Sequence, residues 1–158
     1  MSIYLKIDQV QGGITAAGHE GSIHVLNYHV RHFRPLTQRT GVNADRLLGV
    51  HDRSTLVLSK NVDDATPPLL SRYYKGSVIP EVVFQHLTTG DQPQCYLENT
   101  FKHVLVTSYE EFCTPDGVSE QIELAFTSQE KRVMLLTNEH QPSSPQSVGY
   151  DYASMELT

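Results

Sequence analysis

NVDDATPPLLSRYYKG, residues 61–76, carries a complete helix signature in a chain whose other segments mostly alternate like strands. Thr66 or Asp64 can accept a backbone N–H as the N-cap, and Pro67 suits the first helical turn, where no N–H partner is needed. Gly76 can adopt the left-handed conformation that commonly ends a helix. The sequence therefore predicts one short helix at about Pro67–Lys75.

The segments around this helix read as strands joined by turns such as TPDG, residues 114–117. Hairpin-linked strands at this spacing are typical of antiparallel sandwiches and barrels. We expect a mainly β fold, an antiparallel β-barrel of two packed sheets with one short flanking α-helix, as a single domain over residues 1–158. The expected strands cover residues 2–8, 22–33, 53–60, 78–87, 94–112, 119–129, 131–137 and 148–157.

Two of these strands allow predictions about which side chains face the core. Strand 22–33 changes phase midway, and a bulge near Val25–Leu26 or burial of both faces would explain the change. In strand 119–129, Ile122, Leu124 and Phe126 should point inward. The long strand 94–112 should present one face through Cys95, Leu97, Phe101, Leu105 and Tyr109.

The segment Arg34–Asp52 is polar, contains Pro35, Gly41 and Gly49, and shows no clean period. It is too long for an ordinary hairpin loop, and long loops in compact domains are usually functional or mobile. We therefore expect a projecting loop.

The bulk composition limits the possible partners. The 158 residues include 12 Lys and Arg against 18 Asp and Glu, a net charge of −6, which opposes nucleic-acid and membrane-surface binding. No signal peptide is expected at Met1–Asp8, and no apolar run reaches the roughly 20 residues that span a bilayer. Cys95 and Cys113 favour two ordinary thiols in a protein made in the cytoplasm, with a single bridge as the alternative.

Candidate chemical sites are weak. His29 and His32 lie three apart, on opposite faces of a strand, and are poorly placed to chelate one ion. Cys113 has no histidine nearby in sequence, and Asp63 and Asp64 are explained by the start of the helix. We expect no catalytic residue, metal site or cofactor, although a histidine-based enzyme remains a minor alternative.

Association is a better explanation of the apolar pattern. Val82 to Phe84 and Val104 to Val106 are consecutive apolar residues, as are Val133 to Leu136, and an outward apolar face must be covered by something. We expect neighbouring copies of the chain to cover part of it, with Val82, Phe84, Val104 and Val106 at the subunit interface. Internal packing of helix and loops, or a monomeric barrel that binds a small apolar ligand, is the alternative.

Three stretches resemble the hemolysin-coregulated proteins, the tube subunits of bacterial type VI secretion systems. The first is YLKID at residues 4–8, followed by Gly12, His19 and IHVL at residues 23–26. The second is VDDATP at residues 62–67, and the third is GYDY at residues 149–152. Their order and spacing match over essentially the whole chain. Departures are Gly12-Gly13-Ile14 in place of the usual Gly-Glu-Ser, and the absence of Trp.

The resemblance implies a β-barrel subunit that forms hexameric rings, which stack into a hollow tube. It implies as partners a contractile sheath, a spike protein and effector cargo in the lumen, and export without a signal peptide. It brings no active site. We expect the 34–52 loop to reach toward the adjacent ring, with a ring-stacking segment made of Gly41, Val42, Asn43, Ala44, Asp45 and Arg46.

Overall fold

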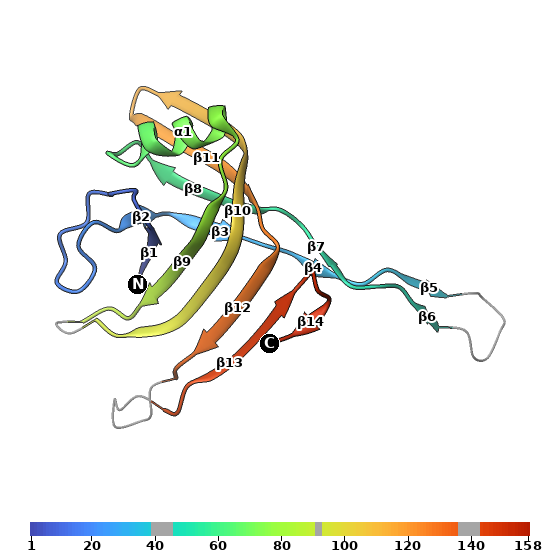
Figure 1. Cartoon of the computed structure of the whole chain (residues 1–158). Helices are drawn as coiled ribbons and strands as arrows, with labels where there is room; N and C mark the ends of the chain where they lie inside the picture. Colours follow the sequence, from blue (N-terminus) through green and yellow to red (C-terminus); the bar gives the residue numbers. More distant parts are fainter. Residues whose placement is uncertain (39–45, 91–92, 136–142) are drawn as a thin grey trace.

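A computed structural model describes residues 1–38, 46–90, 93–135 and 143–158, with only the backbone described at 36–38 and 46–48. One helix lies among the strands of these ranges (Figure 1). The elements are β1 (Ser2–Ile7), β2 (Ile23–Val25), β3 (Asn27–His29), β4 (His32–Phe33), β5 (Leu36–Gln38), β6 (Arg46–Leu48), β7 (Asp52–Arg53), β8 (Leu56–Asn61), α1 (Thr66–Lys75), β9 (Ile79–Leu87), β10 (Cys95–Thr114), β11 (Gly117–Ala125), β12 (Ser128–Val133), β13 (Gln146–Asp151) and β14 (Glu156–Leu157).

Two antiparallel sheets share the long strand β10. Its first half pairs with β9 and β12, and its second half pairs with β11. One sheet therefore runs β2-β1-β9-β10-β12-β13-β14 and the other runs β10-β11-β8-β3. The mainly β class, the two sheets and the single short helix are confirmed.

The sheets also meet at Leu26, on the side away from β10. Strand β2 pairs with β1 of the first sheet, whereas β3 pairs with β8 of the second. Leu26 lies between them, and its N–H donates to the Ser59 carbonyl at 2.8 Å. The phase change predicted at Val25–Leu26 is present, but its cause is a change of sheet and not the predicted bulge or burial of both faces, since Leu26 is 46 % exposed.

Strand β10 alternates with three irregularities, at Cys95–Leu97, at His103 and at Val106–Ser108, so the predicted face holds only in part. Phe101 is buried, but His103 adopts a left-handed φ of 51° and shifts the inward positions to Val104 and Val106. The predicted inward position of Leu105 is therefore wrong. The pairing with β11 shifts register between Val106 and Ser108, and beyond that point Tyr109 packs against the core.

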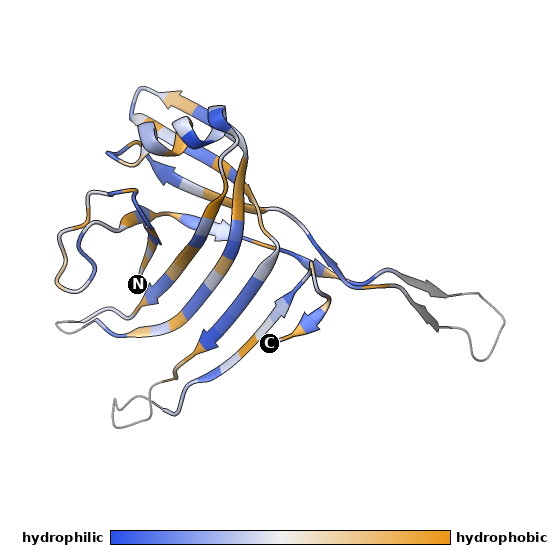
Figure 2. Cartoon of the chain, in the orientation of Figure 1, coloured by the Kyte–Doolittle hydropathy of each residue, from blue (hydrophilic) through white to orange (hydrophobic). Residues whose placement is uncertain are grey.

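The core lies between the two sheets, where inward side chains from both interdigitate. Figure 2 shows hydrophobic and hydrophilic residues alternating along the strands, as expected when one face is buried. Ile122, Leu124 and Phe126 of the β11 region are buried, as predicted. From the helix side, Ala65 and Leu69 join the same cluster.

Helix α1 ends as predicted but begins differently. Gly76 has a φ of 62° and its N–H donates to the Tyr73 carbonyl at 3.2 Å. The N-cap is Ala65, without a side-chain cap, so the predicted capping by Thr66 or Asp64 is wrong. The Thr66 hydroxyl instead accepts the N–H of Asp63 at 3.2 Å, because the turn before the helix is organised around Lys60.

The segment expected to be a projecting loop forms a two-stranded ribbon. Strand β4 pairs with β7, and β5 pairs with β6. The ribbon extends away from both sheets (Figure 1). The projection was predicted correctly, but backbone pairing holds its described part as strands. No helix within the described ranges is long and apolar enough to cross a membrane.

Candidate assembly surface and the pocket at the ribbon root

The four side chains predicted at a subunit interface lie in the core of the chain itself. Val82, Phe84 and Val104 have 0 % of their surface exposed, and Val106 has 8 %. A side chain without exposed surface cannot contact another subunit, so a contact between copies must use other residues. Of the predicted stacking segment, Gly41–Asp45 lies outside the described residues, and Arg46 belongs to β6.

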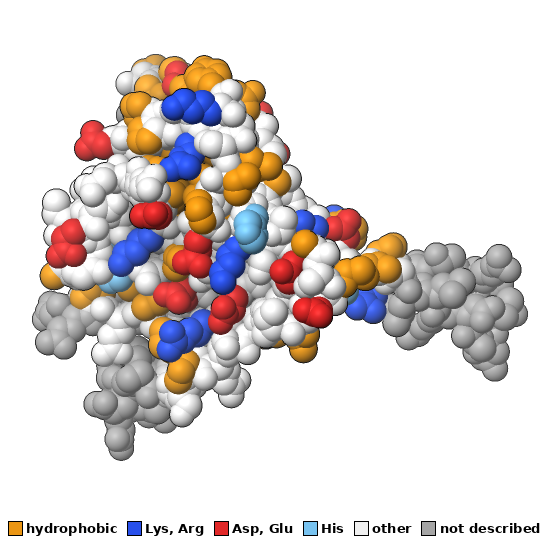
Figure 3. Space-filling view, in the orientation of Figure 1, with side chains coloured by type: hydrophobic (Ala, Val, Ile, Leu, Met, Phe, Trp, Pro, Cys, Tyr) orange, Lys and Arg blue, Asp and Glu red, His pale blue; other side chains and the backbone are white. Residues whose placement is uncertain are grey.

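Large apolar side chains are instead exposed around α1 and the nearby strand ends. Tyr74 is 75 % exposed, and Tyr73 packs against it with ring centroids 5.5 Å apart. We call the set Val62, Tyr73, Tyr74, Phe112 and Val118 the helix-end patch. Hydrophobic side chains gather at the end of the molecule that carries α1 (Figure 3). Exposed apolar groupings of this kind commonly mark contact surfaces.

The root of the ribbon is fastened to the C-terminal strands by Arg53. Its Nη2 donates to the Phe126 carbonyl at 2.5 Å, and its guanidinium carbon lies 4.0 Å from the centre of the Tyr152 ring. The Phe126 ring lies 5.3 Å away. Such cation–π contacts contribute more when partly shielded from water.

Aromatic rings from distant parts of the chain meet beside Arg53. His32 Nδ1 and the Tyr152 hydroxyl are 2.9 Å apart, and the two rings are nearly parallel, with centroids 6.5 Å apart. His51 packs edge-on against Tyr150 with centroids 4.2 Å apart. The ribbon supplies the histidines and the C-terminal segment supplies the tyrosines.

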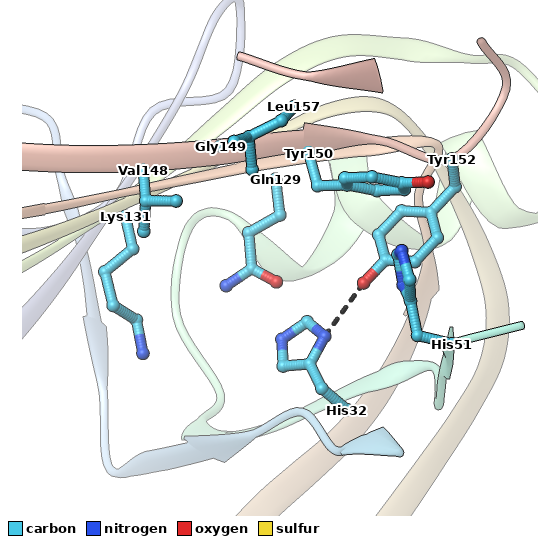
Figure 4. A pocket seen from close by; sticks show the side chains of 9 residues that line it. All are labelled: His32, His51, Gln129, Lys131, Val148, Gly149, Tyr150, Tyr152 and Leu157. Carbon is cyan, nitrogen blue, oxygen red and sulfur yellow. Dashed lines mark hydrogen bonds between the residues drawn. The ribbon is translucent and has the colours of Figure 1, made fainter. Parts of the chain in front are cut away.

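A pocket of about 370 Å³ opens between this cluster and strands β12 to β14. Figure 4 shows the Gln129 amide and the Lys131 side chain on one side and His32 on the other. The pocket is lined by His32, His51, Gln129, Lys131, Val148, Gly149, Tyr150, Tyr152 and Leu157.

Burial lowers the pKa of His32, and the charge of Lys131 lowers it further. The Gln129 amide acts in the opposite direction, while His51 and Arg53 add smaller lowering effects. The pKa of His86 is lowered as well, by burial and by Lys131. Both imidazoles therefore favour the neutral form, in which each ring has one donor and one acceptor nitrogen.

A buried charged cluster joins the start of α1 to the second sheet. Lys60 is fully buried, and its Nζ lies 2.7 Å from Asp63 and 2.8 Å from Glu120. The Tyr109 hydroxyl donates to Glu120 at 2.8 Å, which together with burial raises the pKa of Tyr109. Lys60 donates hydrogen bonds to the Asn61 carbonyl, to Asp63 and to Thr66, and it forms an ion pair with Glu120, so we interpret the cluster as structural.

The two cysteines, possible metal ligands and the cavity between the sheets are the remaining candidate sites. Cys95 and Cys113 are free thiols, which confirms the favoured prediction over a single bridge. Within the described ranges, no three His, Cys, Asp or Glu side chains are grouped to hold a metal ion. The cavity between the two sheets, beside Phe101 and Phe126, has no room for a water molecule.

Sequence reasoning missed the pocket because its two halves come from opposite ends of the chain. His32 and Tyr152 are separated by 120 positions. One signal was present: Tyr150 and Tyr152 alternate along a strand and so share a face. Their histidine partners required knowledge of how the ribbon folds back.

The fold and surface define a class of protein: a two-sheet β domain with one flanking helix, a projecting ribbon and exposed apolar ends. The sequence matches the family described as "Type VI secretion system effector, Hcp" over residues 4–132, and the chain belongs to that family. It is a type VI secretion system protein. No curated protein matches the sequence.

Solved structures share this fold. A structure described as that of a type six secretion system protein has a TM-score of 0.90 and 21 % identity, with 99 % of each chain covered. Hcp1 from Salmonella typhimurium has a TM-score of 0.79 and 21 % identity, covering 99 % of this chain and 98 % of that one. A type VI secretion system effector from Yersinia pestis has a TM-score of 0.72 and 23 % identity, with coverages of 94 % and 98 %.

Proposed function

We propose that this chain is a structural subunit of the type VI secretion tube. Six copies form a ring, and rings stack into a hollow tube that is exported without a signal peptide and can carry effector proteins. A contractile sheath and a spike protein are its partners in this proposal, and it performs no catalysis. Membership in the family supports the role as a tube subunit. The ring and the carriage of effector proteins are further parts of the proposal for this chain.

The observation that carries the proposal is the helix-end patch. Its tyrosines and apolar residues lie on α1 and on the β10–β11 hairpin, and the chain leaves them uncovered. Tyrosine is enriched at protein interfaces, where it provides a large apolar area and a polar tip. We propose that this patch contacts the next subunit in the ring, within an interface of about 1,600 Å² in total.

A pair of charge substitutions tests this contact. Tyr74→Asp should reduce the fraction of protein in rings at least tenfold, because it places a charge in a desolvated contact. Met155→Asp is the matched control, since Met155 is also exposed and apolar but lies at the C-terminal end. Mass photometry at equal concentrations gives the ring fraction. Equal ring fractions for both variants would remove the helix-end patch from the interface.

We further propose that the ribbon reaches the adjacent ring in the stack. Its described strands β4 to β7 project from the sheets, and β5 and β6 lie away from the subunit's own core. Deletion of Gly41–Arg46 should leave single rings but reduce stacking. Electron microscopy of long tubes formed at wild-type concentration by the deletion variant would contradict this role.

The alternative of a monomeric barrel with an apolar ligand inside has less support. The space between the two sheets is filled by core side chains, and the cavity there has no room for a water molecule. An apolar ligand needs a preformed cavity of at least several hundred cubic ångströms.

A further inference from the structure

We propose that the pocket at the ribbon root binds the free carboxyl end of a peptide chain whose last side chain is apolar. This site lies between β12–β14 and the β4–β7 root, away from the helix-end patch. It does not depend on ring formation. Such a chain end offers a carboxylate, a backbone N–H and an apolar side chain, and one feature of the pocket fits each of these groups.

Lys131 supplies the positive charge. Its side chain reaches into the pocket beside Gln129 (Figure 4), and none of the ion pairs between described side chains includes it. The same charge lowers the pKa of both His32 and His86. A carboxylate next to Lys131 would form a charge-assisted hydrogen bond.

No carboxylate of the described chain already occupies this position. Glu130 follows Gln129 directly, so its side chain points to the other face of β12. Asp52 is engaged by Arg53, and Asp151 accepts the N–H groups of Ala153 and Ser154. Lys131 is exposed and has no carboxylate partner in the described chain, so its charge is available to a ligand.

Gln129 supplies a hydrogen-bond acceptor. It is only 7 % exposed, and its Oε1 makes no hydrogen bond of good geometry in the described part of the chain, although the amide lies near enough to the His32 ring to raise the pKa of that imidazole. A buried polar atom without a partner is costly, and its presence in a pocket points to a ligand group. In Figure 4 the amide faces the open space near His32. The backbone N–H of a terminal residue is a suitable donor.

The spacing of these two groups suits one residue of a peptide. Gln129 and Lys131 lie two apart on β12, so both point to the same face, about 7 Å apart along the strand. A terminal residue carries its N–H and its carboxylate on one Cα, and the long Lys131 side chain spans the remaining distance.

Apolar side chains form the remaining wall. Val148, Leu157 and the Tyr150 ring line the pocket, and its volume of about 370 Å³ is in the range of small-ligand sites. A last side chain such as leucine would bury apolar surface there. His32, whose pKa is lowered, favours the neutral form and adds no second positive charge beside Lys131.

The test uses N-acetyl-leucine as the probe, with NMR titration of the His32 ring and the Gln129 side-chain amide. N-acetyl-leucine should give saturable shifts at both groups. N-acetyl-leucinamide removes the charge, and the ester analogue 2-acetoxy-4-methylpentanoate removes the N–H donor. Each should bind about tenfold more weakly or worse. A tetrapeptide ending in leucine should bind as N-acetyl-leucine does, and its amidated form should not.

Substitutions test whether Lys131 binds N-acetyl-leucine. Lys131→Gln should weaken N-acetyl-leucine at least about tenfold, whereas Lys102→Gln should leave it unchanged. Lys102 is a matched control because it is also exposed, on the neighbouring strand, and only weakly paired with Glu81 at 4.0 Å. The proposal is overturned if no saturable shift occurs, if the amide binds equally well, if Lys131→Gln has no effect, or if the free amino-acid derivative binds but the tetrapeptide does not.

Discussion

Lys60 shows how a single buried residue organises the start of the helix. Its ammonium contacts Asp63, Glu120 and the Thr66 hydroxyl within 3.1 Å. The Asp63 carboxylate also accepts the N–H of Ala65 at 3.0 Å, which shapes the turn before α1. The VDDATP stretch is therefore a turn that closes over a buried lysine.

Removing the Lys60 charge should be strongly destabilising. Lys60→Met leaves Glu120 buried without its partner and should lower the free energy of unfolding by about 3–5 kcal/mol. The double variant Lys60→Met, Glu120→Leu should recover part of this loss, since no buried charge remains. Urea unfolding measures both.

The exposed pair Lys102–Glu81 provides the control for this experiment. Lys102→Met should change stability by about 1 kcal/mol or less, as for other surface ion pairs. If Lys60→Met lowered the free energy of unfolding only as much as Lys102→Met does, the buried cluster would contribute no more than a surface ion pair.

His32 should make stability depend on pH. Its folded pKa is lowered from the ordinary value of 6.5 by burial first and Lys131 second. The unfolded chain therefore binds the proton more readily, so this contribution to stability is present above about pH 6.5 and is lost as the pH falls below it. His32→Gln should abolish this component of the pH dependence.

The measurement compares the free energy of unfolding of wild type and His32→Gln between pH 7.5 and pH 5. The wild type should lose stability relative to the variant as the pH falls. His29→Gln, at an exposed strand position, is the control and should run parallel to wild type. A constant difference between wild type and His32→Gln would contradict the assignment.

At the scale of elements, the ribbon depends on its root. Strands β4 and β7 each contain two residues and share one ladder, so pairing alone gives them little stability. Arg53 adds the contacts with Tyr152 and the Phe126 carbonyl. We infer that these contacts keep the ribbon in a fixed direction relative to the sheets.

Arg53→Ala should loosen the root without unfolding the domain. Hydrogen exchange of the amides at residues 31–33 and 52–54 should accelerate about tenfold or more, while β9 and β10 stay protected. Arg31→Ala is the control, because Arg31 lies only over the exposed Phe33 ring. Unchanged exchange at the root in Arg53→Ala would show that the ladder holds by itself.

Most elements could be predicted from sequence because alternation and turn residues act locally. Strand β11 and the left-handed Gly76 are examples. The left-handed conformation of His103 could not be predicted, since such a conformation at a non-glycine residue is imposed by the surrounding fold. The sequence predicts a loop for the ribbon because strands of two or three residues are too short to show an alternation of apolar and polar residues.

At the scale of the whole molecule, the interface residues were the least predictable. Runs such as Val82 to Phe84 indicate burial but do not tell whether the core or a neighbour covers each face. In the fold, Val82 and Phe84 point into the core and Val83 is only half-buried. The pocket was equally hidden, because it needs Gln129 and His32 to meet across the fold.

Solved structures with low sequence identity to this chain have the same fold. The fold therefore depends on the pattern of apolar and polar residues more than on particular residues. Relatives at 21–23 % identity retain TM-scores of 0.72 to 0.90. The tyrosines of α1 are exposed apolar side chains in this chain. We infer that ring formation covers them.

The most direct measurement is the particle mass of the purified chain by sedimentation velocity over a range of concentrations. The proposed ring predicts a species of six times the 17.8 kDa subunit mass, lost in Tyr74→Asp but kept in Met155→Asp. A single 17.8 kDa species at every concentration would contradict assembly as the function of this protein.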